Sequence, residues 1–114
     1  MKQIKKSDRP ISTPELFVAR VDGRKTQTLD KFYKKIAKKL HFPDYFSSNL
    51  DALADCLCDL SWIGQPNVKL FIKNPTEFLA AENEEIRQSV MEIFEDAQEN
   101  PMDEESSFEA IGAV

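Results

Sequence analysis

The sequence predicts an α/β fold in which a three-stranded parallel sheet packs against about four helices. Three segments with strand character, near residues 15–22, 67–73 and 107–114, are separated by amphipathic helical segments. Strands that alternate with helices favour a parallel sheet with right-handed crossovers. The chain has 114 residues, 41% of them hydrophobic, which is enough for one folded domain. We expect residues 15–114 to form this domain and residues 1–14, which are basic and contain two prolines, to be a loose leader.

The first strand and the first helix follow from apolar spacing. In residues 15–22, alternate positions are apolar: Phe17, Ala19 and Val21. Gly23 closes this strand, and Thr28 is a typical cap for a helix that continues to Leu40. The helix has apolar residues at spacings of three and four: Leu29, Phe32, Tyr33, Ile36 and Leu40. Its opposite side is basic: Lys31, Lys34, Lys35, Lys38 and Lys39.

The next segment has the most informative pattern. Residues 41–48 are predicted to form a loop, because Pro43 ends the preceding helix. Residues 49–60 are predicted to form a helix with one apolar stripe: Leu50, Leu53, Leu57 and Leu60. On the opposite side, three carboxylates are spaced four residues apart: Asp51, Asp55 and Asp59.

The second half of the chain alternates strand and helix again. Residues 67–73 have a nearly continuous apolar centre, which suits a strand covered on both faces. Thr76 is a candidate cap for a short helix through Leu79, and a longer helix is predicted over residues 82–98. A short third strand over residues 107–114 completes the predicted sheet.

The formal net charge of −5 is unevenly distributed. Residues 1–39 contain twelve Lys/Arg and four Asp/Glu, whereas residues 82–105 contain ten Asp/Glu and only Arg87. Acidic surfaces suit basic protein partners, while direct binding of nucleic acid needs concentrated positive charge. No apolar run is long enough to span a bilayer, and none follows the basic N-terminus as in a secretory signal. We therefore expect a cytoplasmic protein that contacts neither membrane nor nucleic acid.

Few residues are suited to catalysis or to holding a cofactor. Cys56 and Cys58 point in different directions on a helix, so we expect two reduced thiols and neither a disulfide nor a metal site. The only histidine, His41, has no patterned partner, and the three glycines are isolated, which excludes a glycine-rich phosphate loop. We expect no cofactor and no enzymatic activity.

The three aspartates are the best candidate site. Like charges four residues apart destabilise a helix by about 0.2–0.5 kcal/mol per pair. A helix that keeps Asp55 and Asp59 despite this cost suggests that a partner uses them. A plain solvated face is the alternative, because this is the commoner use of Asp on a helix. A hydrolase with paired carboxylates needs a desolvated cleft, whereas these carboxylates should be solvated.

The stretch LHFPDYFSSNLDALADCL, residues 40–57, resembles the barstar family of intracellular inhibitors of small secreted bacterial ribonucleases. Weaker similarity extends over nearly the whole chain from Glu15 onward. The resemblance implies a three-stranded parallel sheet with helices packed on it, in agreement with the element order above. The matching residues are Pro43, Asp44, Tyr45, Asn49, Leu50, Asp51, Ala52, Leu53, Asp55, Cys56 and Leu57.

The resemblance also implies which residues would bind a partner. They are Tyr45 in the loop, Asn49 at the helix start, Asp51 and Asp55 on the exposed face, and Asp96 late in the long helix. A carboxylate placed among the basic groups of a ribonuclease would imitate an RNA phosphate. Asp55 is the choice for this role, with Asp51 in support and Tyr45 adding aromatic contact area. The implied partner is one basic ribonuclease, bound one-to-one.

Three departures from the family leave the partner open. Ala54 occupies a position where the family often has Trp, Ser47 a position where Gly is common, and Asn100 a position where an acidic residue is found. The loss of contact area at Ala54 bears on the partner more than on the fold. A barstar-fold interaction module whose partner is not a ribonuclease is therefore the alternative.

Overall fold

The computed structural model describes residues 15–101 and 105–113. Three parallel strands form one sheet in the order β1-β2-β3. They are β1 (Leu16–Asp22), β2 (Asn67–Lys73) and β3 (Ser107–Ala113). The predicted sheet is thus confirmed, while the expected leader, residues 1–14, and the last residue of the predicted third strand lie outside the described residues.

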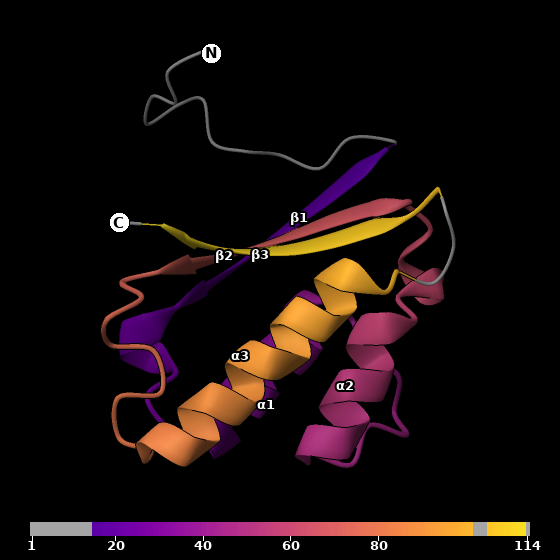
Figure 1. The fold of residues 1–114 in the computed structure, drawn as a ribbon. Helices are drawn as coiled ribbons and strands as arrows, with labels where there is room; N and C mark the ends of the chain where they lie inside the picture. The colour runs from indigo at the N-terminus through magenta and orange to yellow at the C-terminus, as the bar shows by residue number, and fades with distance from the viewer. Residues whose placement is uncertain (1–14, 102–104, 114) are drawn as a thin grey trace.

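All three α-helices of the described chain lie on one face of the sheet (Figure 1). They are α1 (Leu29–Lys39), α2 (Leu50–Cys58) and α3 (Glu84–Glu99), and there are two 3-10 turns, η1 (Gly23–Lys25) and η2 (Ser61–Ile63). Because the strand order equals the chain order, crossovers of one hand bring every helix to the same face. The helices run against the strand direction, so their C-terminal ends approach the amino ends of the strands (Figure 1).

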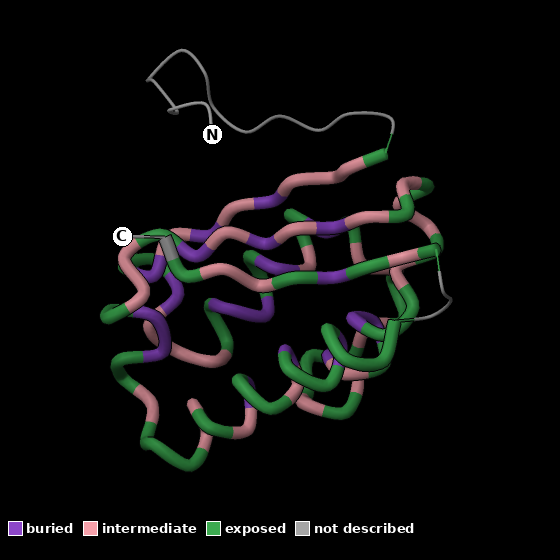
Figure 2. Tube along the Cα trace, turned by 45° about the horizontal axis from the view of Figure 1, so that its top comes forward, coloured by how far each residue is buried: buried purple, intermediate pink, exposed green. Residues whose placement is uncertain are grey.

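The strands are covered by helices on one face only, which corrects the expectation for β2. Val68, Leu70 and Ile72 are buried, whereas Phe71 between them is only half-buried. Buried and partly exposed residues alternate along the sheet in the same way in Figure 2. The apolar run at the centre of β2 therefore does not indicate a second covering layer, because Phe71 packs on the open face beside its neighbours in register, Arg20 and Ile111.

Aromatic rings join the helices to the sheet. The ring of Phe32 in α1 meets that of Phe78 edge to face at a centroid distance of 5.0 Å and that of Phe94 in α3 at 6.1 Å. Phe94 in turn approaches Phe108 of β3 at 6.3 Å. These four side chains are all buried, so a single core extends from α1 to β3.

The predicted short helix from Thr76 to Leu79 is wrong, and the helix count is three instead of about four. The segment 75–81 is a series of turns. Leu79 has a left-handed backbone, with φ of 56°, and its N–H donates to the carbonyl of Thr26 at 2.9 Å. The N–H of Ala81 donates to the carbonyl of Gln27 at 3.0 Å. These long-range bonds replace the bonds that a helix would make locally.

The starts of α1 and α2 agree with the prediction, whereas α3 (Glu84–Glu99) begins two residues later and ends one residue later than the predicted helix over residues 82–98. Thr28 caps α1 by accepting from the N–H of Lys31 at 3.3 Å, and Asn83 caps α3 by accepting from the N–H of Ile86 at 2.8 Å. The helix predicted over residues 49–60 ends at Cys58, two residues early. The chain then continues into η2, whose C-cap residue, Gly64, has a left-handed backbone with φ of 81°.

Candidate partner-binding surface

The loop before α2 is held by aromatic packing. The backbone reverses at His41, where φ is 53°, and the N–H of Phe42 returns to the carbonyl of Ala37 at 2.9 Å. The indole N–H of Trp62 donates to the carbonyl of Leu40 at 2.9 Å. The Phe42 ring lies 6.1 Å from the Trp62 ring. The loop is thus attached to both α1 and η2.

Two adjacent aromatic residues of this loop point in different directions. The Phe46 ring meets Phe42 at 4.9 Å and Tyr33 of α1 at 5.8 Å, so it packs inward. Tyr45 is 70% exposed, which makes it the more exposed of the two large hydrophobic residues that stand out from the described surface. An exposed tyrosine on a fixed loop is a typical contact residue for a partner.

Asn49 begins α2 and positions its first carboxylate. Its Oδ1 accepts from the N–H of Ala52 at 2.8 Å, which satisfies one of the free donors of the first turn. Asp51 lies in the same turn, where the helix dipole favours an anion. The sequence placed Asn49 at the helix start, and the structure adds the capping bond.

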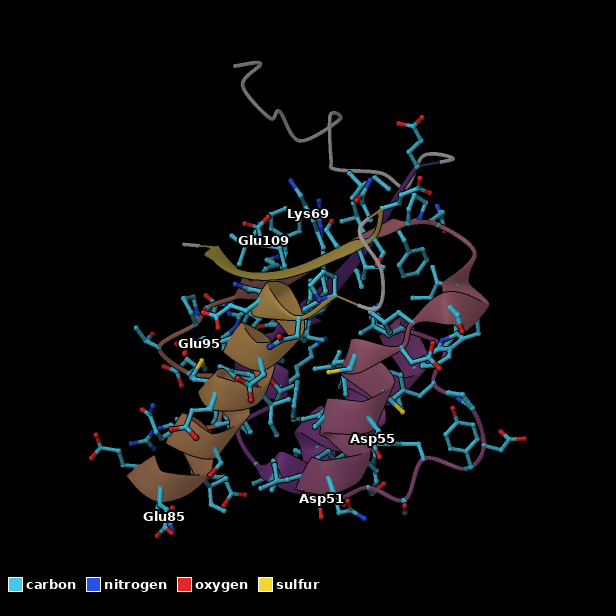
Figure 3. All side chains as sticks on the ribbon, turned by 45° about the vertical axis from the view of Figure 1, so that its right-hand side comes forward. Asp51, Asp55, Lys69, Glu85, Glu95 and Glu109 are labelled. Atoms are coloured by element: carbon cyan, nitrogen blue, oxygen red, sulfur yellow. The ribbon has the colours of Figure 1, made fainter. Side chains whose placement is uncertain are left out.

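Asp51 and Asp55 lie one turn apart on the exposed face of α2 (Figure 3). The opposite face is buried through Leu53, Cys56 and Leu57. Neither carboxylate takes part in an ion pair with a described residue. Both are therefore free to meet cationic groups of another molecule.

These two carboxylates border an open hollow that the sequence did not predict. The hollow runs between α2, the end of the loop and α1, and its other lining residues are Leu29, Tyr33, Ser47, Ser48, Asn49, Leu50 and Ala52. Tyr33 was predicted as a core residue and is indeed buried, but it also reaches this surface. A tyrosine within an otherwise apolar stripe was the available signal, because its polar tip usually needs contact with water or a partner.

Asp59 is separated from the other two aspartates of the predicted ladder. It is the C-cap of α2, not a residue of the helix, and its Oδ1 accepts from the N–H of Ser61 at 3.3 Å. It lines a different cavity, beyond the C-terminal end of α2. The expected row of three carboxylates is thus a pair, Asp51 and Asp55, with a third carboxylate outside the helix.

Asp96 is exposed on α3, the helix that packs beside α2. The thiol of Cys58 connects the two helices electrostatically, because partial burial and then the charges of Asp55 and Asp96 raise its pKa. Burial also raises the pKa of Cys56, with further contributions from Asp55 and Asp59. Both thiols are free, and Cys58 lies exposed between the acidic residues of α2 and α3.

Neither a cluster of metal ligands nor a membrane-spanning helix is found within residues 15–101 and 105–113. No group of three His, Cys, Asp or Glu side chains converges there as metal ligands would. No described helix is long and apolar enough to cross a bilayer. The strand order also has no point at which it reverses, which is where open α/β sheets usually form a ligand crevice.

Comparisons with known proteins agree with this arrangement. Residues 16–111 match the family model described as Barstar (barnase inhibitor). The chain is also 37% identical over 84 residues to the Bacillus subtilis (strain 168) protein named "Putative ribonuclease inhibitor YrdF", a match that covers 74% of this chain and 88% of that protein. The region matched by the family model contains β1, β2, all three α-helices of the described fold, and β3 as far as Ile111. The chain therefore belongs to the barstar family.

Proposed function

We propose that this protein is an inhibitor that binds one basic ribonuclease, one-to-one, and blocks its active site from the acidic side of α2. The observation that carries the proposal is the presence of two exposed carboxylates without ion-pair partners, Asp51 and Asp55 on α2, together with the exposed ring of Tyr45 in the preceding loop. The family match and the named relative support a ribonuclease as the partner.

Phosphate mimicry is the proposed mechanism. A ribonuclease must hold RNA phosphate with cationic side chains, and a carboxylate meets the same donors with charge-assisted hydrogen bonds. Asp55 takes this role, because it lies on the exposed face of α2 at the edge of the hollow. Asp51 adds a second carboxylate one turn away, and Asp96 extends the acidic surface onto α3. Tyr45 and Asn49 contact the partner from the loop and the helix start.

No chemical step is assigned to this chain. Asp51 and Asp55 are both exposed to solvent beside an open hollow, whereas general acid and base pairs work in desolvated clefts. The family model that matches the chain is described as a barnase inhibitor, which supports an inhibitor over an enzyme. We place the action of the protein in the cytoplasm, where two free thiols stay reduced.

The first experiment is inhibition of a panel of small basic bacterial ribonucleases by the wild-type chain and by Asp55→Ala. Truncating one member of a buried, hydrogen-bonded charge pair costs about 2–5 kcal/mol, so the inhibition constant should rise by about thirtyfold or more. Glu95→Ala is the matched control, because Glu95 is also an exposed carboxylate but points away from Asp51 and Asp55 (Figure 3). Equal inhibition by wild type and Asp55→Ala would contradict the proposed site.

A second candidate is a barstar-fold interaction module with a partner that does not cleave RNA. Ala54, half-buried on α2 next to Asp55, favours it, because a small residue there presents little contact area to a ribonuclease. If no ribonuclease of the panel is inhibited, while Asp55→Ala abolishes the capture of a partner that lacks ribonuclease activity, this candidate replaces the first.

A further inference from the structure

A second cavity, of about 340 Å³, lies at the edge of the sheet where β2 and β3 begin. Its walls include Leu57, Val68 and Phe108, which are buried and apolar, and Ser61 and Ser107, which are polar and exposed. Asp59 and Glu105, both exposed, also line it. The cavity is separate from the hollow beside Asp51 and Asp55, with which it shares no lining residue.

The C-terminal turns of two helices contribute to the walls of this cavity. The last turn of α2 lines it through Cys58, and the last turn of α3 lines it through Ala97. A helix C-terminus carries roughly half a negative charge, which basic residues in the last turn usually offset. α1 follows this rule with Lys38 and Lys39, but neither α2 nor α3 has a basic residue in its last turn.

None of the described residues that line the cavity is Lys, Arg or His. The Asp59 carboxylate is held at the end of α2 by the N–H of Ser61. Helix ends, carboxylates and apolar walls together suit a cationic group carried on an aliphatic stem. An arginine side chain fits best, because its guanidinium is weakly hydrated and its donors can reach several oxygens at once.

We propose that this cavity accepts an arginine side chain of the partner protein, next to the surface of Asp55 and Asp96. This inference rests on the proposed function, because it supplies a second anchoring point for the same basic partner. Cys58 connects the two places, because it lines the cavity and follows Asp55 by three residues on α2, about one helical turn. A partner bound over Asp55 would thus have the cavity within reach.

The test uses the isolated full-length chain and blocked arginine, N-acetyl-arginine amide, as the probe. Its neutral isostere, N-acetyl-citrulline amide, is the matched ligand control. In an ¹⁵N-labelled sample, blocked arginine should shift the amide signals of Ser61, Gly64 and Ser107 in a saturable way, and the citrulline compound should not. Equal shifts from both compounds, or none from blocked arginine, would overturn the proposal.

Three variants refine this test, two at the cavity and one as a control. Asp59→Asn should weaken binding of blocked arginine by about two- to fivefold, the effect of losing one exposed ion pair. Glu85→Gln, at the far end of α3, removes the same charge and should change the affinity little (Figure 3). Ser61→Lys places a cationic side chain of the protein itself at the cavity and should abolish the shifts. Unchanged affinity in both Asp59→Asn and Ser61→Lys would contradict the proposal.

The outcome is independent of the ribonuclease assay. If blocked arginine does not bind but Asp55→Ala still loses inhibition, the cavity has no such role and the proposed function stands. If blocked arginine binds as described while no ribonuclease is inhibited, the cavity accepts arginine and the partner is of another kind.

Discussion

At the level of single residues, sequence reasoning found the chemical groups but not their surroundings. Tyr45 and Phe46 are adjacent aromatic residues in one loop, and nothing in their order indicates which one faces the solvent. Phe46 faces inward because its ring packs against the rings of Phe42 and Tyr33. Asp59 shows the same limit, because its four-residue spacing from Asp55 fits a helix that in fact ends one residue earlier.

Gly23 provides a residue-scale prediction. A Cβ at this position would lie 2.2 Å from the carbonyl oxygen of Asn74 and 2.9 Å from that of Lys73. Both obstacles are backbone atoms, so Gly23→Ala should lower the free energy of unfolding by about 1–3 kcal/mol or more. Gly112→Ala is the control, since its Cβ would only approach the Pro75 side chain at 3.4 Å. Urea titrations that give equal losses for the two variants would contradict this explanation.

Asp22 provides a second residue-scale prediction, for acidic pH. Hydrogen bonds from Asn74 and then Arg24 hold the pKa of this carboxyl well below its ordinary value of 3.8. Since the pKa is lower in the folded state, the stabilisation is complete above the ordinary value and is lost as the pH falls towards the folded-state pKa. The stability difference between wild type and Asp22→Asn should therefore be constant at about pH 5–7 and shrink in stronger acid.

This pH dependence is measured by chemical denaturation of both chains across the acidic range. Asp30→Asn is a suitable control, because Asp30 forms an ion pair with Lys34 in which both side chains are about three-quarters exposed to solvent. Its effect on stability should be small at every pH. A difference for Asp22→Asn that grows on acidification would have the wrong sign and would refute the assignment.

At the level of secondary structure, the periodicity of apolar residues located all three strands and all three helices. It failed at segment 75–81, where the apolar residues Phe78 and Leu79 are buried by turns that bond to Thr26 and Gln27. Helix propensity and cap chemistry are local signals, and they cannot report bonds made to residues about fifty positions away. It also failed for β2, where an apolar centre did not mean that both faces are covered.

The cap of α2 provides a prediction at this scale. Asn49→Ala removes the bond to the N–H of Ala52 and should cost about 0.5–2 kcal/mol of stability. It should also weaken inhibition, because the first turn carries Asp51. Asn83→Ala is the matched control: it removes the equivalent bond of α3, at 2.8 Å, and leaves the first turn of α2 intact. Equal inhibition by the two variants, measured on folded protein, would show that the cap has no role in binding.

At the level of the whole molecule, charge is divided between different helices. The five lysines of α1 are all exposed, and the exposed carboxylates proposed for the partner lie on α2 and α3. This division was visible in the sequence as a basic first third and an acidic last third. The convergence of two uncompensated helix C-termini on one cavity was not visible, because it depends on how the crossovers place α2 beside α3.

The proposed encounter with a basic partner should therefore depend on salt. The screening length falls from about 10 Å at 0.1 M to about 3 Å at 1 M ionic strength, so the association rate should drop steeply over this range. The dissociation rate, set by close contacts, should change much less. Stopped-flow measurements on an inhibited ribonuclease test this, and an association rate that does not respond to salt would argue against electrostatic steering.

The strand register also bears on how the chain folds. Leu16 pairs with Asn67, and Asn67 pairs with Ser107, so each strand pairing joins positions about 40–50 residues apart. Such pairings require long loops to close before they contribute energy, which slows folding relative to a helical bundle of the same length. The acidic helix α2 lies inside the first of these loops. Its carboxylates therefore reach their final positions relative to α3 only after the slow, long-range step of sheet formation, and inhibitory activity should appear with the kinetics of that step.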